Sequence, residues 1–499
     1  MATRALRRTG KGVRRVVIGL PLVAALFAPL SLGGQEPTVG ESASEGGVRR
    51  ALESLEVAAL DFDQPKVEER EVAGVPVLLL EDAALPLVTF QAYFEGGYGR
   101  YPRSDFAAAM GLPALLRYGG TSGRTPLEVD EIIAHYALQP RFGTAGGSVT
   151  TSMNTLTEHV DTALALWTEM IAEPRFDEGE IAAWRARQLE SVRRRADDPG
   201  RLAVVEMNRL LYGEHPVGWE MTEDDLVPGR LGPERFRMLH GRIVCRENLV
   251  LGFSGDLSWE EAGPMVRRVV RRIPPCTEDL PEPPLPDIRR EAGIFVIERP
   301  GLEQAVVVMA HPTDVRLEDD VEYFSALVAN SVLGAGGFSS RILRRIRTEE
   351  GFAYSATSLW TTPRRHEGIV GAMTRTRPEN VAPAIEVILE TMRELREAPP
   401  ASHEVGTTVD QVVNGFVFNF ESASQVVSRA MYYRAVGLPD DWLERYLEGV
   451  QAVGPRDVHD VLEAHLRPAA MTILVVGDPR RMGLEALEGL GTVTTLDVR

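Results

Sequence analysis

The sequence predicts an α+β protein built from two similar lobes, each a mainly antiparallel sheet packed with helices. Short apolar or alternating stretches typical of strands are interspersed with amphipathic stretches of several helical turns. A proline-rich and acidic stretch at residues 273–288 interrupts this pattern midway along the chain. The order of elements before that break recurs after it.

The first 34 residues have the composition of an export signal. They carry six basic residues and no acidic residue, and an apolar run at residues 16–32 follows, interrupted by Pro21 and Pro29. Because the run is short and broken, it is poorly suited to span a membrane. We therefore expect export to the periplasm or the outside, with membrane attachment only if the signal stays uncleaved.

The remaining chain divides into a leading segment, two lobes and a linker. Residues 35–66 are rich in Gly, Ser and Glu and are expected to be flexible. We place the first lobe at residues 67–272, the linker at residues 273–290 and the second lobe at residues 291–499.

Two internal correspondences favour a duplicated lobe. Residues 151–181 and 371–405 follow the same order of strand, polar turn, amphipathic helix and proline. Near the end of each half, a β-rich stretch ends on Gly-Asp, at residues 255–256 and at residues 477–478. The two Gly-Asp pairs are 222 residues apart (477 minus 255). Duplication is the natural explanation.

Some individual elements are also clear. Residues 77–80, 88–93 and 306–310 have the composition of strands. A helix is predicted to start at Thr125, because Thr, Pro and Glu at positions 125, 126 and 128 form a capping box with proline in the first turn.

Charge and cysteine content exclude some classes of protein. The net charge is −18, and removing the six basic residues of the signal would make it −24, which disfavours nucleic-acid binding. Cys245 and Cys276 are the only cysteines, too few for a structural zinc site. They could pair in an oxidising compartment, or remain two buried free thiols; the sequence leaves both open.

The stretch at residues 110–121, MGLPALLRYGGT, resembles the zinc-binding helix of the insulinase-like peptidases, which include pitrilysin and the mitochondrial processing peptidases. In that family, His-x-x-Glu-His follows Gly-Leu-Ala. Two His residues four positions apart share a helix face and grip one zinc ion, while the Glu acts as general base on the bound water.

In this chain the matching positions hold Ala114, Arg117 and Tyr118. Alanine has no donor atom, arginine stays protonated, and one tyrosine makes no site alone. The family's third ligand aligns with Ser191, with Glu190 beside it. We expect an ordinary packed helix kinked at Pro113, and neither catalytic residues nor bound metal in this chain.

No other catalytic or metal-binding pattern replaces the lost one. No two of the nine histidines lie three or four residues apart. His459, Glu463 and His465 are interpreted as exposed polar residues of an amphipathic helix. The run at residues 334–340 lacks the third glycine of a dinucleotide fingerprint and the Gly-Lys-Ser/Thr of a phosphate loop.

Residues 333–355, LGAGGFSSRILRRIRTEEGFAYS, resemble the family's second-lobe signature. The resemblance assigns Arg347, Gly351, Phe352 and Tyr354 to the motif and implies that Arg347 and Tyr354 hold the substrate backbone, facing the zinc lobe across an internal chamber. Arginine and tyrosine both offer donors to peptide carbonyls.

The alternative is a solvated basic face. In this interpretation Arg341, Arg344, Arg345 and Arg347 are simply countered by the acids at positions 349 and 350.

The resemblance covers residues 67 to about 497 and departs from the family at the zinc site. It implies a non-catalytic subunit that binds peptide substrates and pairs with a homologous, zinc-bearing subunit, the zinc being held by the partner. The alternative is a structural or peptide-binding scaffold of the same fold with no role in proteolysis.

Overall fold

The computed structural model describes residues 66–289 and 291–497, and these belong to one compact unit, Leu60–Arg499. The predicted export signal and nearly all of the predicted flexible segment lie outside the described residues. Within the described part, no helix is both long and apolar enough to cross a membrane.

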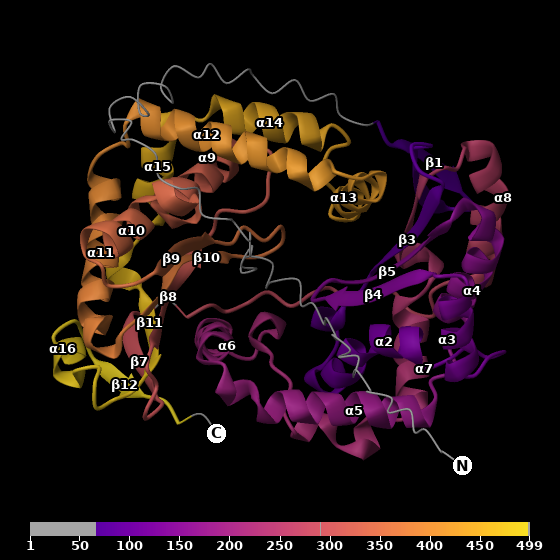
Figure 1. Ribbon diagram of the computed structural model, residues 1–499, viewed down its shortest axis with the longest axis horizontal. Helices are drawn as coiled ribbons and strands as arrows, with labels where there is room; N and C mark the ends of the chain where they lie inside the picture. The colour runs from indigo at the N-terminus through magenta and orange to yellow at the C-terminus, as the bar shows by residue number, and fades with distance from the viewer. Residues whose placement is uncertain (1–65, 290, 498–499) are drawn as a thin grey trace, which may run out of the picture. The chain divides into compact units, whose positions relative to one another are not determined.

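The chain forms two six-stranded sheets, each flanked by helices (Figure 1). The first sheet has the order β1-β2-β6-β3-β5-β4 and the second β12-β7-β11-β8-β10-β9. The strands of the first sheet are β1 (Glu68–Val72), β2 (Val75–Glu81), β3 (Leu87–Glu95), β4 (Gln139–Ala145), β5 (Ser148–Leu156) and β6 (Leu249–Gly255). Those of the second are β7 (Gly293–Glu298), β8 (Ala305–Thr313), β9 (Ser355–Trp360), β10 (Gly368–Thr376), β11 (Thr472–Gly477) and β12 (Val493–Thr495).

The two sheets share a five-stranded plan. Strands β2, β6, β3, β5 and β4 correspond in order to β7, β11, β8, β10 and β9. In both sheets the pair β2/β6 or β7/β11 is parallel, and the pairs that follow it are antiparallel. The predicted α+β class, with two similar and mainly antiparallel lobes, is confirmed. Only the sixth strand differs, because β1 precedes its neighbour in the chain whereas β12 comes at the other end of its lobe.

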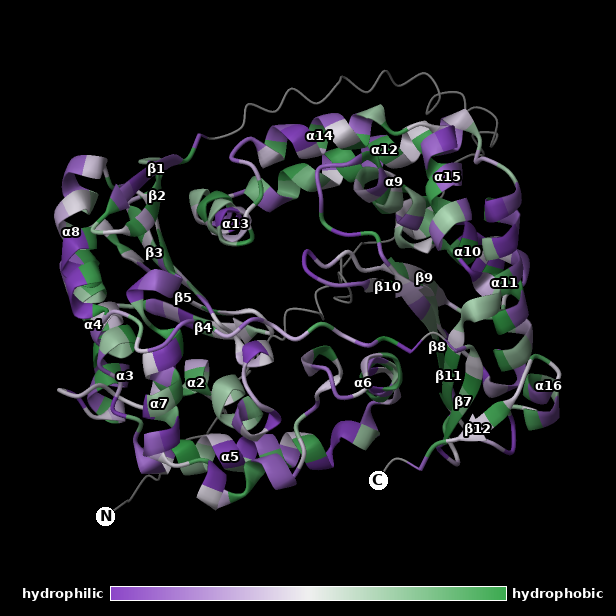
Figure 2. Ribbon diagram, turned by 180° about the vertical axis from the view of Figure 1, so that it is seen from behind, coloured by the Kyte–Doolittle hydropathy of each residue, from purple (hydrophilic) through white to green (hydrophobic). Residues whose placement is uncertain are grey.

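Helices cover these sheets, and their polar faces are turned outward. Figure 2 shows hydrophobic colour along β8 and β11, whereas α5 carries many hydrophilic residues. The helices of the first half are α2 (Phe106–Tyr118), α3 (Pro126–His135), α4 (Val160–Ala172), α5 (Glu178–Arg193), α6 (Pro199–Tyr212), α7 (Pro233–Ile243) and α8 (Trp259–Arg272). Those of the second half are α9 (Val321–Asn330), α10 (Arg341–Leu343), α11 (Val381–Glu397), α12 (Ser402–Val417), α13 (Ala423–Ala435), α14 (Trp442–Ala452), α15 (Pro455–His465) and α16 (Leu484–Glu488).

Local signals in the sequence position several of these elements. The capping box of α3 is present, with the Thr125 hydroxyl accepting from the Glu128 backbone N–H and the Glu128 carboxylate accepting from Thr125. Strands β6 and β11 end on the glycines of the two predicted Gly-Asp pairs. Gly255 has φ +109°, a conformation that side chains other than glycine rarely adopt.

Both faces of the central strands are buried, and each face meets different helices. In β11, Ile473 and Val475 join the core made with the second half's own helices. Leu474 and Val476 join a separate apolar cluster on the opposite face. Strands buried on both faces read as continuous apolar runs, as this one does.

Helix α6, from the first half of the chain, covers that opposite face of the second sheet. Its residues Leu202, Met207 and Leu211 are buried in one cluster with Val306 and Val308 of β8. This helix therefore packs in an apolar cluster with the sheet of the other lobe along its whole length.

Helix α13, from the second half, covers the first sheet in return. Val427 and Met431 are buried in a cluster with Leu78 of β2 and Val250 of β6. Gly252 makes the close approach possible, because a Cβ there would lie 2.6 Å from a Val427 methyl carbon. Each half thus contributes one helix to the sheet of the other.

Polar contacts fix the placement of α13. The Gln91 side-chain amide of β3 donates to the Ser424 carbonyl over 2.8 Å. Arg434 pairs with Glu69 of β1 at 3.0 Å. These contacts join residues more than three hundred positions apart in the chain.

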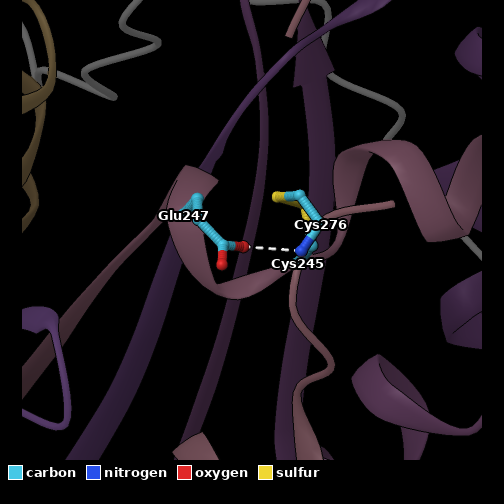
Figure 3. A group of neighbouring side chains, drawn as sticks. All are labelled: Cys245, Glu247 and Cys276. Atoms are coloured by element: carbon cyan, nitrogen blue, oxygen red, sulfur yellow. Dashed lines mark hydrogen bonds between the residues drawn. A yellow bond between two sulfur atoms is a disulfide. The ribbon is translucent and has the colours of Figure 1, made fainter. Parts of the chain in front are cut away.

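The disulfide Cys245–Cys276 joins the first lobe to the linker, with 4.9 Å between the two Cα atoms (Figure 3). The Cys276 backbone N–H also donates to the Glu247 carboxylate over 2.6 Å. No helix or strand lies between Arg272 and Gly293 in the described residues, so the disulfide ties the start of this irregular segment to the first lobe. Of the two possibilities left open by the sequence, the structure has the paired one.

We expect Met431→Ala to lower the free energy of unfolding by about 2–4 kcal/mol, because it empties part of the buried contact between α13 and the first sheet. Denaturant unfolding of the purified chain measures this. Ser428→Ala, at an exposed position of the same helix, should change stability by at most about 0.5 kcal/mol. Equal effects of the two variants would contradict the packing of α13 on the sheet.

Reduction of the disulfide should lower the free energy of unfolding by about 3–4 kcal/mol, because the bridge closes a loop with a sequence separation of 31 residues. Thermal unfolding with and without dithiothreitol tests this. Cys276→Ser should reproduce the loss and abolish the response to reductant. A wild-type chain that melts identically in both conditions would show that the bridge does not contribute.

Candidate functional site

Helix α2 carries the three positions that match the zinc motif, and each serves a structural purpose. Ala114 packs against the first core, while Leu112 and Leu115 are fully buried beside it. Arg117 pairs with Asp130 of α3 at 2.8 Å and lies over the Tyr118 ring at 4.6 Å. The helix runs as one element through Pro113.

Helix α5 packs on α2, as the family resemblance implies, but brings no metal ligand with it. Gly111 of α2 lies so close to Trp184 that a Cβ would come within 2.9 Å of the indole ring. Ser191 is half-buried, and the neighbouring Glu190 is exposed and paired with Arg194 at 2.5 Å. The matched positions therefore supply one alanine, one paired arginine, one tyrosine and one serine.

The glycine-rich start of the second-lobe motif packs on strand β9, and helical turns follow it from Arg341 to Glu349. Gly334 lies against the backbone of Ser358, where a side chain would clash. The buried Ser340 hydroxyl donates to the Gly337 carbonyl over 2.6 Å. Gly351 has φ +67°, which explains the glycine of the motif. The glycine-rich run is therefore a packed turn whose geometry sets the direction of the following residues.

Three of the four arginines in this motif are paired with carboxylates. Arg341 makes two hydrogen bonds of 2.8 Å to Glu404. This contact lowers the pKa of Glu404 and raises that of Arg341. Arg345 bonds the carboxylates of α11 at positions 390 and 394, and Arg344 lies 3.4 Å from Glu349.

Arg347 differs from these three. Among the described residues it has no carboxylate partner, and its guanidinium carbon lies 4.5 Å from the Tyr354 ring and 4.8 Å from the Phe338 ring. Tyr354 is 78% exposed and Phe338 is 76% exposed. Stacking on aromatic faces holds a guanidinium in place and leaves its in-plane donors available.

Phe338 is the residue that the sequence did not single out. It follows the glycines of the turn, at a position where a large exposed aromatic side chain has no role in a core. Its position as a large apolar residue inside a glycine-rich run was the feature of the sequence that could have indicated an exposed binding residue. The structure brings Phe338, Arg347 and Tyr354 together as one cluster, which we call the Arg347 cluster.

Two groups of side chains in the described residues have the proximity of metal ligands. The first combines Cys245, Glu247 and Cys276, but its sulfur atoms are joined in the disulfide and offer no thiolate (Figure 3). The second combines His459, Asp460 and Glu463, whose carboxylates are exposed. Exposed acids beside one histidine are common without any ion.

The prediction that His465 is an exposed polar residue is wrong. It is 9% exposed, and its Nδ1 lies 2.9 Å from Asp314 while its Nε2 lies 3.5 Å from Glu322. Although burial acts to raise it, the pKa of Asp314 is lowered by a backbone hydrogen bond and by His465. The last turn of α15 faces β8 and α9, which the helix pattern alone did not reveal.

Comparison with known proteins shows which proteins this chain resembles in sequence and fold. Residues 230–412 match the family model described as the peptidase M16 inactive domain. A non-peptidase homolog from Helicobacter pylori is 20% identical over 419 residues, covering 83% of this chain and 94% of that protein. An uncharacterized zinc protease from Streptomyces coelicolor is 22% identical over 319 residues, covering 63% and 68%.

Solved structures extend the similarity. The crystal structure of a peptidase M16 inactive domain from Pseudomonas fluorescens has a TM-score of 0.74 and 22% identity, covering 83% of this chain and 98% of that one. The structure of a protease from Helicobacter pylori gives 0.73 and 17%, covering 83% and 99%. The resemblance predicted from the motifs is confirmed: the chain is similar in sequence and fold to homologues of the M16, or insulinase-like, peptidases, and residues 230–412 match the model of that family's inactive domain.

Proposed function

We propose that this chain is the non-catalytic, substrate-binding subunit of a zinc metalloendopeptidase, and that it pairs with a homologous subunit that holds the zinc. In this arrangement the Arg347 cluster grips the backbone of an unfolded peptide while the partner hydrolyses it. The chain itself contributes specificity, not bond cleavage.

The single observation that carries this proposal is that Arg347 has aromatic neighbours and no carboxylate partner among the described residues. A solvated basic face would pair each arginine with a nearby acid, and Arg341, Arg344 and Arg345 behave in that way. Arg347 is instead held between two exposed aromatic rings. A guanidinium with available donors beside a tyrosine hydroxyl suits a peptide carbonyl.

The position of Tyr354 adds support. It immediately precedes β9, the edge strand of the second sheet, whose other side has no strand partner in the described residues. Edge strands present unpaired peptide groups, to which an extended peptide can add. A peptide held by the Arg347 cluster would begin its path beside such an edge.

We further propose that the mature protein is exported, to the periplasm or the outside. The basic and apolar composition of the first 34 residues supports this. The Cys245–Cys276 pair agrees with it, because disulfides persist in oxidising compartments.

The second candidate is a scaffold of the same fold with no role in proteolysis. The observation that favours it is the complete replacement of the zinc motif by packing and ion-pair residues on α2. The two candidates differ in what they require of Arg347, since a scaffold does not use its donors.

The purified chain is expected to hold no stoichiometric zinc and to cleave no peptide by itself, because Ala114, Arg117, Tyr118 and Ser191 place no pair of ligands on one ion. Elemental analysis and a peptidase assay on the isolated chain measure both. One tightly held zinc per chain, with activity that a chelator removes, would sink the proposal.

In the pair reconstituted with a homologous chain that has an intact His-x-x-Glu-His motif, Arg347→Ala and Tyr354→Phe should each lower kcat/KM. Loss of a hydrogen bond to the substrate costs on the order of 1–3 kcal/mol, or about one to two decades in rate. Subunit association, measured by analytical ultracentrifugation, should not change.

Arg344→Ala is the matched control, because its pair with Glu349 is exposed on both sides and contributes little. It should leave kcat/KM within about twofold of the parent value. Equal activity of all three variants would remove the substrate-gripping role and favour the scaffold.

A further inference from the structure

A cavity of about 340 Å³ lies where the two halves and the linker meet. Its walls come from β3, the β4–β5 turn, residues 283–285 of the linker, the β9–β10 loop and the end of α13. Sites for small molecules begin at about 300 Å³. None of the residues assigned to the Arg347 cluster or to the degenerate zinc positions lines it.

The lining of the cavity carries a net positive charge, whereas the whole chain is negatively charged. Arg100, Arg364 and Arg365 line the cavity, with Glu95 as the only carboxylate among the lining residues. Two positive charges are thus left over in a chain whose net charge is −18. Glu282 acts electrostatically on Arg100 but does not line the cavity.

The arrangement around Glu95 leaves donors available on Arg365, the more exposed of its two arginine partners. The Arg100 side chain is 6% exposed, bonded to Glu95 and to the Pro281 carbonyl. Arg365 reaches the same carboxylate at 3.1 Å through Nη2 and is 47% exposed. Within the described residues this is the only hydrogen bond of Arg365, so its Nη1 and Nε can donate to a ligand.

Part of the lining is apolar and partly exposed. Val217, Leu285 and Tyr432 line the cavity, although 37%, 75% and 41% of their surfaces are accessible. Pro283 and Pro284 add to the apolar part of the lining. Exposed apolar side chains gathered around one hollow indicate an apolar ligand body.

The two histidines that line the cavity add no carboxylate-like negative charge to balance its arginines. His215 donates from Nε2 to the Pro284 carbonyl and accepts at Nδ1 from the Val217 N–H, which is the pattern of a neutral ring. His366 lies 5.6 Å away, between ring centroids, and bonds through Nδ1 to the Glu367 carbonyl.

We propose that this cavity binds a small ligand that carries one carboxylate on an apolar body, with the carboxylate on Arg365 and the body against Leu285 and Tyr432. Guanidinium and carboxylate form strong, charge-assisted hydrogen bonds. Two sources share this chemistry, namely a fatty acid and the C-terminal residue of a peptide. Because both halves and the linker form the walls, an occupied site would link the two lobes through the ligand.

The test titrates the full chain by calorimetry with octanoate and N-acetyl-leucyl-leucine, each beside its amide. The carboxylates should bind at least about tenfold more tightly than the amides. Binding of octanoate alone would identify a fatty acid as the source, and binding of the dipeptide alone would identify a peptide end.

Arg365→Gln should remove the preference for the carboxylate and leave the weak binding of the amides unchanged. Leu285→Glu, at a largely exposed position, adds a negative charge to the wall and should weaken the carboxylates several-fold. Arg344→Gln, outside the lining, is the control and should bind as the parent does. Equal binding of acids and amides, no binding of either, or unchanged binding by Arg365→Gln would overturn the proposal.

Discussion

The reciprocal packing of α6 and α13 is the contact on which the rest of the structure depends. Each central sheet is apolar on both faces, and its own helices cover only one of them. The second face would remain in water if the other half of the chain did not supply a helix. Burial of that apolar surface is the main force available to join the lobes. The cavity at the lobe junction exists only because this packing brings β3, the linker and α13 together.

The arginines of the second-lobe motif differ in their partners, and this difference gives them two roles. Paired arginines such as Arg341 and Arg345 fasten the turn to α12 and α11, and their charges are used locally. Arg347 follows two residues after Arg345; within the described residues it pairs with no carboxylate, and its guanidinium lies over two aromatic rings instead. Both arrangements hold a guanidinium, but only the second leaves it able to bind something else. The cavity at the lobe junction shows a similar division, because Arg100 is buried and bonded to Glu95 and the Pro281 carbonyl, whereas Arg365 is half exposed and bonded to Glu95 alone among the described residues.

The sequence predicted what local chemistry and repetition determine. A capping box at Thr125 and the strand ends at Gly255 and Gly477 depend on neighbours within a few residues, and all three are present. What depends on distant packing could not be derived. The amphipathic pattern of α13 requires an apolar partner but does not say which sheet provides it, and the pattern of α15 does not reveal that His465 meets Asp314. The pairing of Cys245 with Cys276 could not be derived either, because it depends on how close the start of the linker lies to Cys245 in the folded chain.

The exchange of helices also imposes an order on folding during synthesis. The first sheet is complete in sequence once β6 has been made, yet one of its faces stays uncovered until α13, more than one hundred and fifty residues later, has emerged. Contacts of such sequence separation form slowly, because a long loop must close first. An apolar sheet face is exposed in the meantime, and such faces promote aggregation. The first half alone is therefore a poor candidate for independent expression, and shielding by a chaperone during synthesis suits this fold.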